Sequence, residues 1–169
     1  MKVAILSDIH ANLEALQSVL ADAAQLQVSH YVGLGDVIGF NGDPAACVES
    51  AMPLFSAAVR GNHEQALLQR GLFGVPLYTA MMDRTAAMLG AELVACLRPL
   101  PRKMSWQGLT LVHASPAASE DWQRISTVPE ARRAFTDFDD FFFDLFASFS
   151  HNFFDTSWVD TTVCNEFLQ

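Results

Sequence analysis

Cysteine is scarce in this chain, and no apolar run is long. The 169 residues include only Cys47, Cys96 and Cys164, and none of these belongs to a Cys-x-x-Cys pair. That spacing excludes a zinc knuckle and a disulfide framework, and it favours reduced thiols. No stretch approaches the ~20 apolar residues of a membrane span, and the apolar run in residues 1–6 is too short for a signal-peptide core. We therefore expect a cytoplasmic protein with no membrane partner.

Basic residues are also few, and they are unevenly placed. All ten lysines and arginines lie at or before Arg133, together with twelve acidic residues, whereas residues 134–169 carry seven acidic residues and no basic one. The body therefore has no basic stripe that could follow a nucleic-acid backbone, and the tail would repel a polyanion. With 51% hydrophobic residues, the chain is expected to fold as one globular domain.

Four short apolar runs end in residues that carry oxygen or nitrogen donors. Residues 3–6 lead into Asp8 and His10, and residues 28–34 lead through Gly35 to Asp36. Residues 57–59 lead into Asn62 and His63, and residues 109–112 lead into His113. In open α/β sheets the ligand site lies beyond the carboxyl ends of the strands, so these side chains are expected to converge. The stretch 31–39, which presents Asp36, is the centre of this arrangement.

Helical patterns lie between the apolar runs. Asn12 is a suitable N-cap for a helix that ends near Gln25, and further helices are predicted over residues 45–52, 65–70 and 77–97, the last of them broken or bent near Gly90. Residues 106–108 indicate a tight turn. The alternation of strands and helices predicts an α/β fold with a mostly parallel sheet that is covered on both faces.

The composition changes at Ala134. Ten of the thirteen phenylalanines follow this point. Six of them share one side of a 3.6-residue helix: Phe135, Phe138, Phe142, Phe146, Phe149 and Phe153. The pattern predicts a core over residues 1–133 and an acidic, Phe-rich segment over residues 134–169 that is helical.

The donors at the strand ends suit a metal centre. Carboxylate, amide and imidazole groups without a thiolate favour Mn, Fe, Zn or Mg ions. A carboxylate can bridge two such ions, and a pair of ions can hold a hydroxide in line with a phosphorus atom. The predicted chemistry is hydrolysis of phosphate esters, with His63 near enough to protonate the leaving alkoxide. The predicted metal ligands are Asp8, His10, Asp36, Asn62 and His113.

The same residues resemble a known family. In order and spacing, Asp8-x-His10, Gly35-Asp36-x-x-Gly39, Gly61-Asn62-His63-Glu64 and Val112-His113 resemble the signature blocks of calcineurin-like metallophosphoesterases. The opening residues 7–16 look like the small bacterial and archaeal phosphodiesterases of that superfamily. The resemblance covers roughly residues 1–133.

The resemblance implies a fold, a reaction and a role for each site residue. The fold would be a sandwich of sheets flanked by helices, and the reaction would be attack of a metal-bridging hydroxide on a small phosphomonoester or phosphodiester. Asp8 and His10 would hold one metal ion, and Asn62 and His113 would hold a second. Asp36 would bridge the two ions, and His63 would be the acid that also contacts the phosphate. The predicted catalytic residues are His63, Asp36 and Asn62.

The C-terminal part departs from the family pattern. The family closes its site with a Gly-His-x-His block on a later strand, followed by further strands of a second sheet. The nearest candidate here is Ser150-His151-Asn152-Phe153, in which Phe153 replaces the second histidine. We therefore expect an incomplete second sheet, a replaced or truncated C-terminus and weaker binding of the first metal ion, so that either a single ion occupies the site or the activity is poor.

The same residues also have purely structural interpretations. Gly35-Asp36 and Gly61-Asn62 are also the residues of ordinary turns. Glu64 is expected to cap or pair within its helix. Among the remaining residues, His30 is expected to be structural or exposed, Asp43 a turn residue, Trp122 a core residue and His151 solvated. The alternative function is a catalytically impaired binding module that assembles as a homo-oligomer through the Phe-rich tail.

Overall fold

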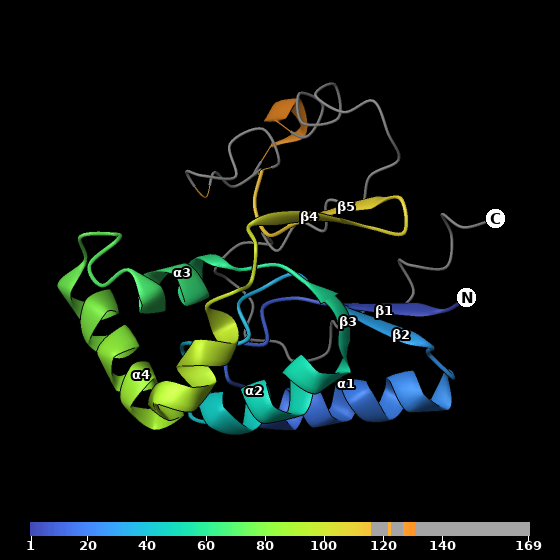
Figure 1. Ribbon diagram of the computed structural model, residues 1–169, viewed down its shortest axis with the longest axis horizontal. Coiled ribbons are helices and arrows are strands. Elements are labelled where there is room, and N and C mark those ends of the chain that lie inside the picture. Colours follow the sequence, from blue (N-terminus) through green and yellow to red (C-terminus); the bar gives the residue numbers. More distant parts are fainter. Residues whose placement is uncertain (116–121, 123–126, 131–169) are drawn as a thin grey trace.

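The computed structural model describes residues 1–115, 122 and 127–130 of the chain (Figure 1). The described part contains five strands, four α-helices and one 3-10 turn. In chain order these are β1 (Val3–Leu6), α1 (Leu13–Gln25), β2 (His30–Gly33), α2 (Pro44–Ala51), η1 (Met52–Leu54), β3 (Phe55–Ala58), α3 (Asn62–Leu68), α4 (Pro76–Leu97), β4 (Lys103–Trp106) and β5 (Leu109–Val112). The predicted α/β class is confirmed.

Strands β1, β2 and β3 form a parallel sheet in that order. The register pairs Leu6 with Gly33, and Gly33 with Ala58, so the carboxyl ends of the strands meet at one edge. Gly33 is required by packing, because a Cβ atom there would lie 2.6 Å from the ring of Phe55. The donors that follow these strands therefore start from the same edge of the sheet.

Strand β5 does not join the parallel sheet. It pairs antiparallel with β4, a strand that the sequence patterns did not predict, and the two form a second sheet. Gln107 and Gly108 form the predicted tight turn, and both have positive φ, as the turns of two-residue hairpins require. The expectation that all four donor-bearing strands belong to one parallel arrangement is thus corrected. A short loop favours the local antiparallel pairing over a crossover.

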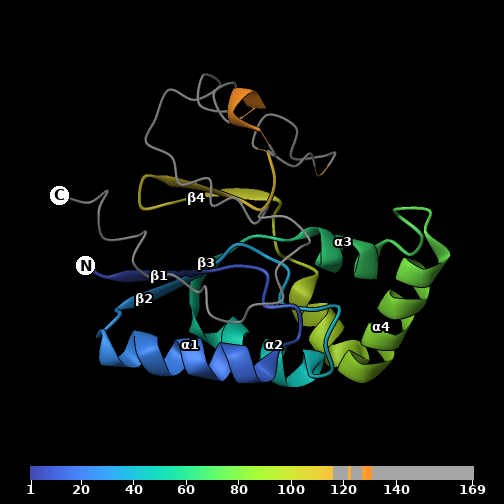
Figure 2. The same cartoon turned by 180° about the vertical axis from the view of Figure 1, so that it is seen from behind.

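The parallel sheet lies between two different layers. Helices α1 and α2 cover one face, and the β4–β5 hairpin covers the other, as both views show (Figures 1 and 2). The core on the helix side includes Leu16, Ile38 and Val48, and the core on the hairpin side includes Val32 and Leu111. The parallel sheet is thus covered on both faces, as predicted, by helices on one face and by a second sheet on the other.

The predicted N-cap at Asn12 and the predicted bend near Gly90 are confirmed, whereas the predicted start of α3 is three residues late. The Oδ1 atom of Asn12 accepts a hydrogen bond from the backbone N–H of Ala15 at 3.1 Å, so Asn12 is the N-cap of α1. Helix α4 has non-helical backbone angles at Gly90, where φ is 70°. Helix α3 begins at Asn62, three residues before the predicted start, so the donor-bearing residues Asn62 and His63 lie in its first turn.

The remaining predictions concern membrane spans and the C-terminal segment. The described part has no helix that is long and apolar enough to cross a membrane. The boundary at residue 133, the Phe-rich helix and His151 all lie outside the described residues, and so these predictions stay predictions.

We predict that Leu111→Ala lowers the free energy of unfolding by about 2–5 kcal/mol, because Leu111 is fully buried where the hairpin packs on the sheet. Urea unfolding followed by circular dichroism would measure the change. The matched control is Leu77→Ala, because Leu77 is 82% exposed and its loss should cost under about 0.5 kcal/mol. Equal stability of the two variants would contradict the packing of β5 on the sheet.

Candidate metal centre

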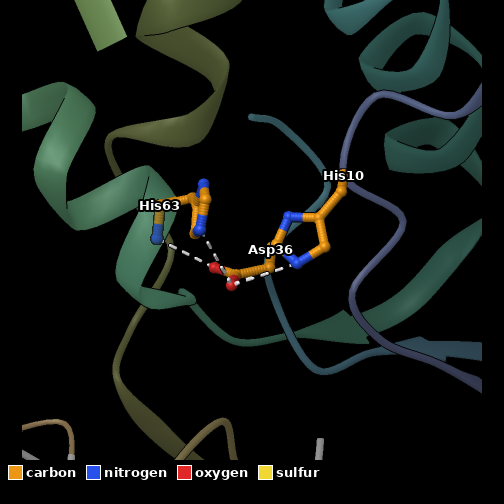
Figure 3. Close-up of side chains that lie close together, drawn as sticks. All are labelled: His10, Asp36 and His63. Atoms are coloured by element: carbon orange, nitrogen blue, oxygen red, sulfur yellow. Dashed lines mark hydrogen bonds and ion pairs between the residues drawn. The ribbon is translucent and has the colours of Figure 1, made fainter. Parts of the chain in front are cut away.

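The carboxylate of Asp36 lies at the centre of the converging donors. Asp36 is 2% exposed, and its Oδ2 atom lies 3.3 Å from Nε2 of His113, 3.8 Å from Nε2 of His63 and 3.9 Å from Nε2 of His10. Figure 3 shows His10 and His63 approaching this carboxylate from separate elements. Its other oxygen, Oδ1, accepts the backbone N–H of His63 at 2.8 Å, which fixes the orientation of the carboxylate.

The remaining predicted ligands join the same cluster. Oδ1 of Asp8 lies 3.4 Å from Nε2 of His10, and Oδ1 of Asn62 lies 3.0 Å from Nε2 of His113. Two groups of three donors have ligand atoms within 4.8 Å of one another, and both groups contain Asp36. One adds Asp8 and His113, and the other adds His10 and His63. The structure thus brings together all six predicted site residues, and the division of the donors between two ions stays a prediction.

Backbone carbonyls orient two of the histidines toward the cluster. Nδ1 of His113 lies 2.7 Å from the carbonyl oxygen of Leu34, and Nδ1 of His10 lies 3.3 Å from that of Ile38. Because only an N–H can hydrogen-bond to a carbonyl, Nδ1 carries the proton and Nε2 faces Asp36. Metal-binding histidines are held in this way by their second nitrogen. The clustered oxygens and Nε2 atoms, most of them buried, would repel one another without a cation, so the residues fit a metal centre.

Burial and the charges of neighbouring residues shift the pKa values of the side chains in the cluster. Burial opposes the charged forms, but the hydrogen bond to Asp36 and its charge raise the pKa of His113 to about 9. Burial likewise opposes ionisation of Asp36, yet His113 and the other histidines hold the pKa of its carboxyl below the usual value. A proton on His113 therefore neutralises Asp36. Burial lowers the pKa of His63 to about 4, so its ring is neutral at pH 7.

Glu64 holds the two main loops of the site together. Its fully buried carboxylate accepts hydrogen bonds from the backbone N–H groups of Asp36 and Val37 at 2.8 Å, of Ile38 at 3.3 Å and of Gly61 at 2.9 Å. Burial and the charge of Asp36 raise the pKa of Glu64 to about 7, and the backbone donors oppose that rise. The expectation that Glu64 caps its own helix is confirmed, because Gly61 is the N-cap of α3. The long-range bonds to residues 36–38 were missed, because no local pattern indicates partners in a distant loop.

Two glycines without a Cβ atom and three residues with left-handed backbone angles shape these loops. A Cβ atom on Gly61 would overlap Oδ1 of Asp36, and one on Gly39 would overlap the ring of His63. Asp8, His10 and Asp36 themselves adopt left-handed backbone angles, with φ between 49° and 54°. Such angles cost free energy in residues other than glycine and persist where the surrounding structure imposes them, typically at functional sites.

The structure also describes three residues that we expected to lie outside the metal centre. His30 is half-buried beside Trp106, at 5.8 Å between ring centroids. Asp43 precedes α2 as its N-cap, without a side-chain cap bond. Trp122 is half-buried, and its ring lies 6.1 Å from that of His113, so it flanks the site. The contacts of Phe40 and Tyr78 with His63 were not predicted, because single aromatic residues in loops give no local signal.

Fold and site together define a class of protein: a layered α/β protein with a candidate metal centre at the carboxyl ends of its strands. Comparison with known families then identifies it. The family model described as calcineurin-like phosphoesterase matches residues 1–154. The chain therefore belongs to the calcineurin-like phosphoesterase family, and the predicted resemblance is confirmed.

Individual relatives come from archaea and bacteria. The chain is 32% identical over 127 residues to the uncharacterized protein MJ0912 of Methanocaldococcus jannaschii, a match that covers 72% of this chain and 52% of that protein. The crystal structure of a metallophosphoesterase from Sphaerobacter thermophilus is 35% identical, with a TM-score of 0.72, and the match covers 83% of this chain and 57% of that one.

A hypothetical protein of Pyrococcus horikoshii, PH1004, shares the fold at 22% identity, with a TM-score of 0.70 over 80% of this chain and 64% of that one. The chain thus spans about half to two thirds of the length of these relatives.

We predict that Glu64→Gln lowers the free energy of unfolding by about 3 kcal/mol, because an amide NH2 would face backbone donors in either orientation. Thermal and urea unfolding would measure the loss. Glu92→Gln, on the exposed side of α4, is the control and should unfold like the parent protein. A stable Glu64→Gln variant would show that the carboxylate does not hold the loops together.

We predict that apparent Mn²⁺ affinity rises with pH. The pKa of His113 is raised to about 9, so at neutral pH a metal ion must displace the proton on this ring. The affinity should increase up to about tenfold per pH unit and level off near pH 9. Calorimetric titrations at pH 6, 7, 8 and 9, in buffers of different ionisation enthalpy, would count the released protons. An affinity that does not vary over this range would contradict the prediction.

Proposed function

We propose that this chain catalyses metal-dependent hydrolysis of phosphomonoesters or phosphodiesters at the Asp36 cluster. One observation carries the proposal: Oδ2 of the buried Asp36 faces the Nε2 atoms of three histidines within 3.9 Å. Family membership supports the same reaction class. Because the chain spans about half the length of its archaeal relative, the activity of a whole protein is part of the proposal.

Each residue has a role that follows from its atoms. Asp36 would bridge two divalent ions through its carboxylate, and four further residues would complete the set: Asp8, His10, Asn62 and His113. Ions bound there would supply Lewis acidity that polarises the phosphoryl group and a water molecule. The amide of Asn62 is oriented for this role, because Oδ1 faces His113 while Nδ2 lies 3.5 Å from the hydroxyl of Tyr78. Mn, Fe, Zn and Mg all fit these donors.

His63 is the proposed proton donor to the leaving oxygen. Its backbone N–H is fixed on Asp36, and its ring lies against His10 at 4.6 Å between centroids. Burial keeps the ring neutral in the protein alone, and a phosphate anion beside it would raise its pKa. The ring could then carry a proton to the departing alkoxide. Nε2 of the ring lies 3.8 Å from Oδ2 of Asp36 and faces the candidate metal centre, whereas Nδ1 is buried against Gly39.

We predict that the protein with Mn²⁺ hydrolyses bis(p-nitrophenyl) phosphate, and that Asp36→Asn lowers kcat/KM by more than about 100-fold, since the carboxylate shared by both donor groups loses its charge and one of its oxygens. Release of p-nitrophenolate would be followed by the visible absorbance of that anion. Asp22→Asn, on the exposed surface of α1, is the matched control.

Equal rates for the parent protein and Asp36→Asn would remove the hydrolytic proposal. The binding and assembly module with a Phe-rich interface would then remain as the alternative function, to be tested by light scattering for self-association.

A further inference from the structure

An exposed phenylalanine stands directly beside the candidate metal centre. Phe40 is 59% exposed, yet its ring centroid lies 4.7 Å from that of His10 and 4.6 Å from that of His63, in edge-to-face geometry. An exposed apolar ring of this size gains little from the hydrophobic effect in the protein alone. Its place against two site histidines therefore calls for a separate reason.

The backbone holds Phe40 in place at a cost. Its φ is 56°, a left-handed value that is rare for a bulky residue. The next residue fixes the loop, because both the backbone N–H and the Nδ2 group of Asn41 donate to the carbonyl oxygen of His10, at 3.2 and 2.9 Å. Gly39 allows the ring of His63 to approach the same loop. Phe40 is thus a positioned residue and not a loosely placed loop side chain.

Further aromatic rings extend from the same histidine. The ring of Tyr78 lies 5.2 Å from that of His63, and the ring of Phe73, which is partly exposed, lies 5.4 Å from that of Tyr78. All these contacts have the edge-to-face geometry that aromatic pairs prefer. Aromatic surface therefore continues outward from the residue proposed to protonate the leaving group.

The open side of the metal centre is the side on which Phe40 stands. The side chains of Asp8 and His10 are 31% and 20% exposed, whereas those of Asp36, His63 and His113 are nearly buried. A phosphate ester that reaches the buried carboxylate must pass Asp8 and His10, and the ring of Phe40 contacts His10. The organic part of the ester would then lie over Phe40.

We propose that Phe40, with Tyr78 beside it, forms a subsite for a flat aromatic group attached to the phosphoryl group of the substrate. This inference rests on the proposed function and adds a substrate class to it. Stacking on an aromatic side chain would hold either an aryl ester or a nucleobase, because both present a π-face. The subsite would favour aromatic over aliphatic esters of the same phosphate.

The first experiment measures binding without turnover. Phenylphosphonate and methylphosphonate have a carbon–phosphorus bond that hydrolysis of esters does not cleave, and they differ only in the aromatic ring. Calorimetric titration of the full chain with Mn²⁺ should show about tenfold tighter binding of the phenyl compound. The preference should fall to about twofold or less in Phe40→Leu, return in Phe40→Tyr and persist in the control Leu77→Ala.

The second experiment separates the two sources of the ring. Thymidine 5′-p-nitrophenyl phosphate and methyl p-nitrophenyl phosphate share a leaving group and differ in the other ester group, which is a nucleoside in the first and a methyl group in the second. If the subsite holds a nucleobase, the ratio of their kcat/KM values should fall about tenfold in Phe40→Leu. If it holds the aryl leaving group, the ratio should stay constant while both esters lose activity in that variant. Either result supports the subsite, provided that the phosphonate preference is present.

The outcomes that would overturn the proposal are distinct. Equal binding of both phosphonates to the parent protein, or a phenyl preference that survives in Phe40→Leu, would show that Phe40 only shields the histidines. In that case hydrolysis of p-nitrophenyl esters would still stand. If the parent protein neither hydrolyses the esters nor binds either phosphonate, the proposed function and the subsite are both wrong.

Discussion

The hydrogen bonds accepted by one buried carboxylate hold the candidate metal centre together. Glu64, in the first turn of α3, binds backbone N–H groups of Asp36, Val37 and Ile38 and of Gly61. These groups belong to two loops that follow neighbouring strands of the parallel sheet. Because a buried backbone donor without a partner costs free energy, each loop depends on Glu64 for its conformation. The position of Asp36, and with it the distances to the three histidines, follows from this single side chain.

A second constraint is the need for positive charge at Asp36. Its carboxylate is nearly inaccessible to water, and the nearby Nε2 atoms of His10 and His113 are oriented toward it by bonds from their Nδ1 atoms to carbonyls. In the protein alone the proton on His113 meets this need, which is why the pKa of that ring is raised. A divalent ion would meet it more fully, because it replaces repulsion among several donors by coordination of each. The same electrostatics therefore connect protonation, metal binding and the proposed chemistry.

The strained loops and the aromatic surface have a common origin. Left-handed angles at Asp8, His10, Asp36 and Phe40 turn the chain sharply at the ends of β1 and β2. Tight turns place the ligands within a few ångströms of one another, and they leave the ring of Phe40 exposed against the histidines. Strain of this kind persists only when the surrounding hydrogen bonds and packing determine the conformation. In this protein the bonds of Glu64 and Asn41 have that role.

Much of the site could be predicted from the sequence, because donors that follow buried strands meet at one edge of a sheet. The convergence of Asp8, Asp36 and Asn62 follows from this rule. The N-cap of α1 and the bend at Gly90 come from local helix signals. Strand β4 and the antiparallel pairing of β5 could not be predicted in this way, because the choice of a pairing partner depends on the whole layer arrangement.

Local sequence alone determined which donors stand at strand ends and where helix α1 begins. Only the tertiary structure decided that Glu64 binds the Asp36 loop and that Phe40 packs on His10 and His63. These contacts join residues 23 to 30 positions apart, and their free energy arises from burial that exists only once the layers have packed.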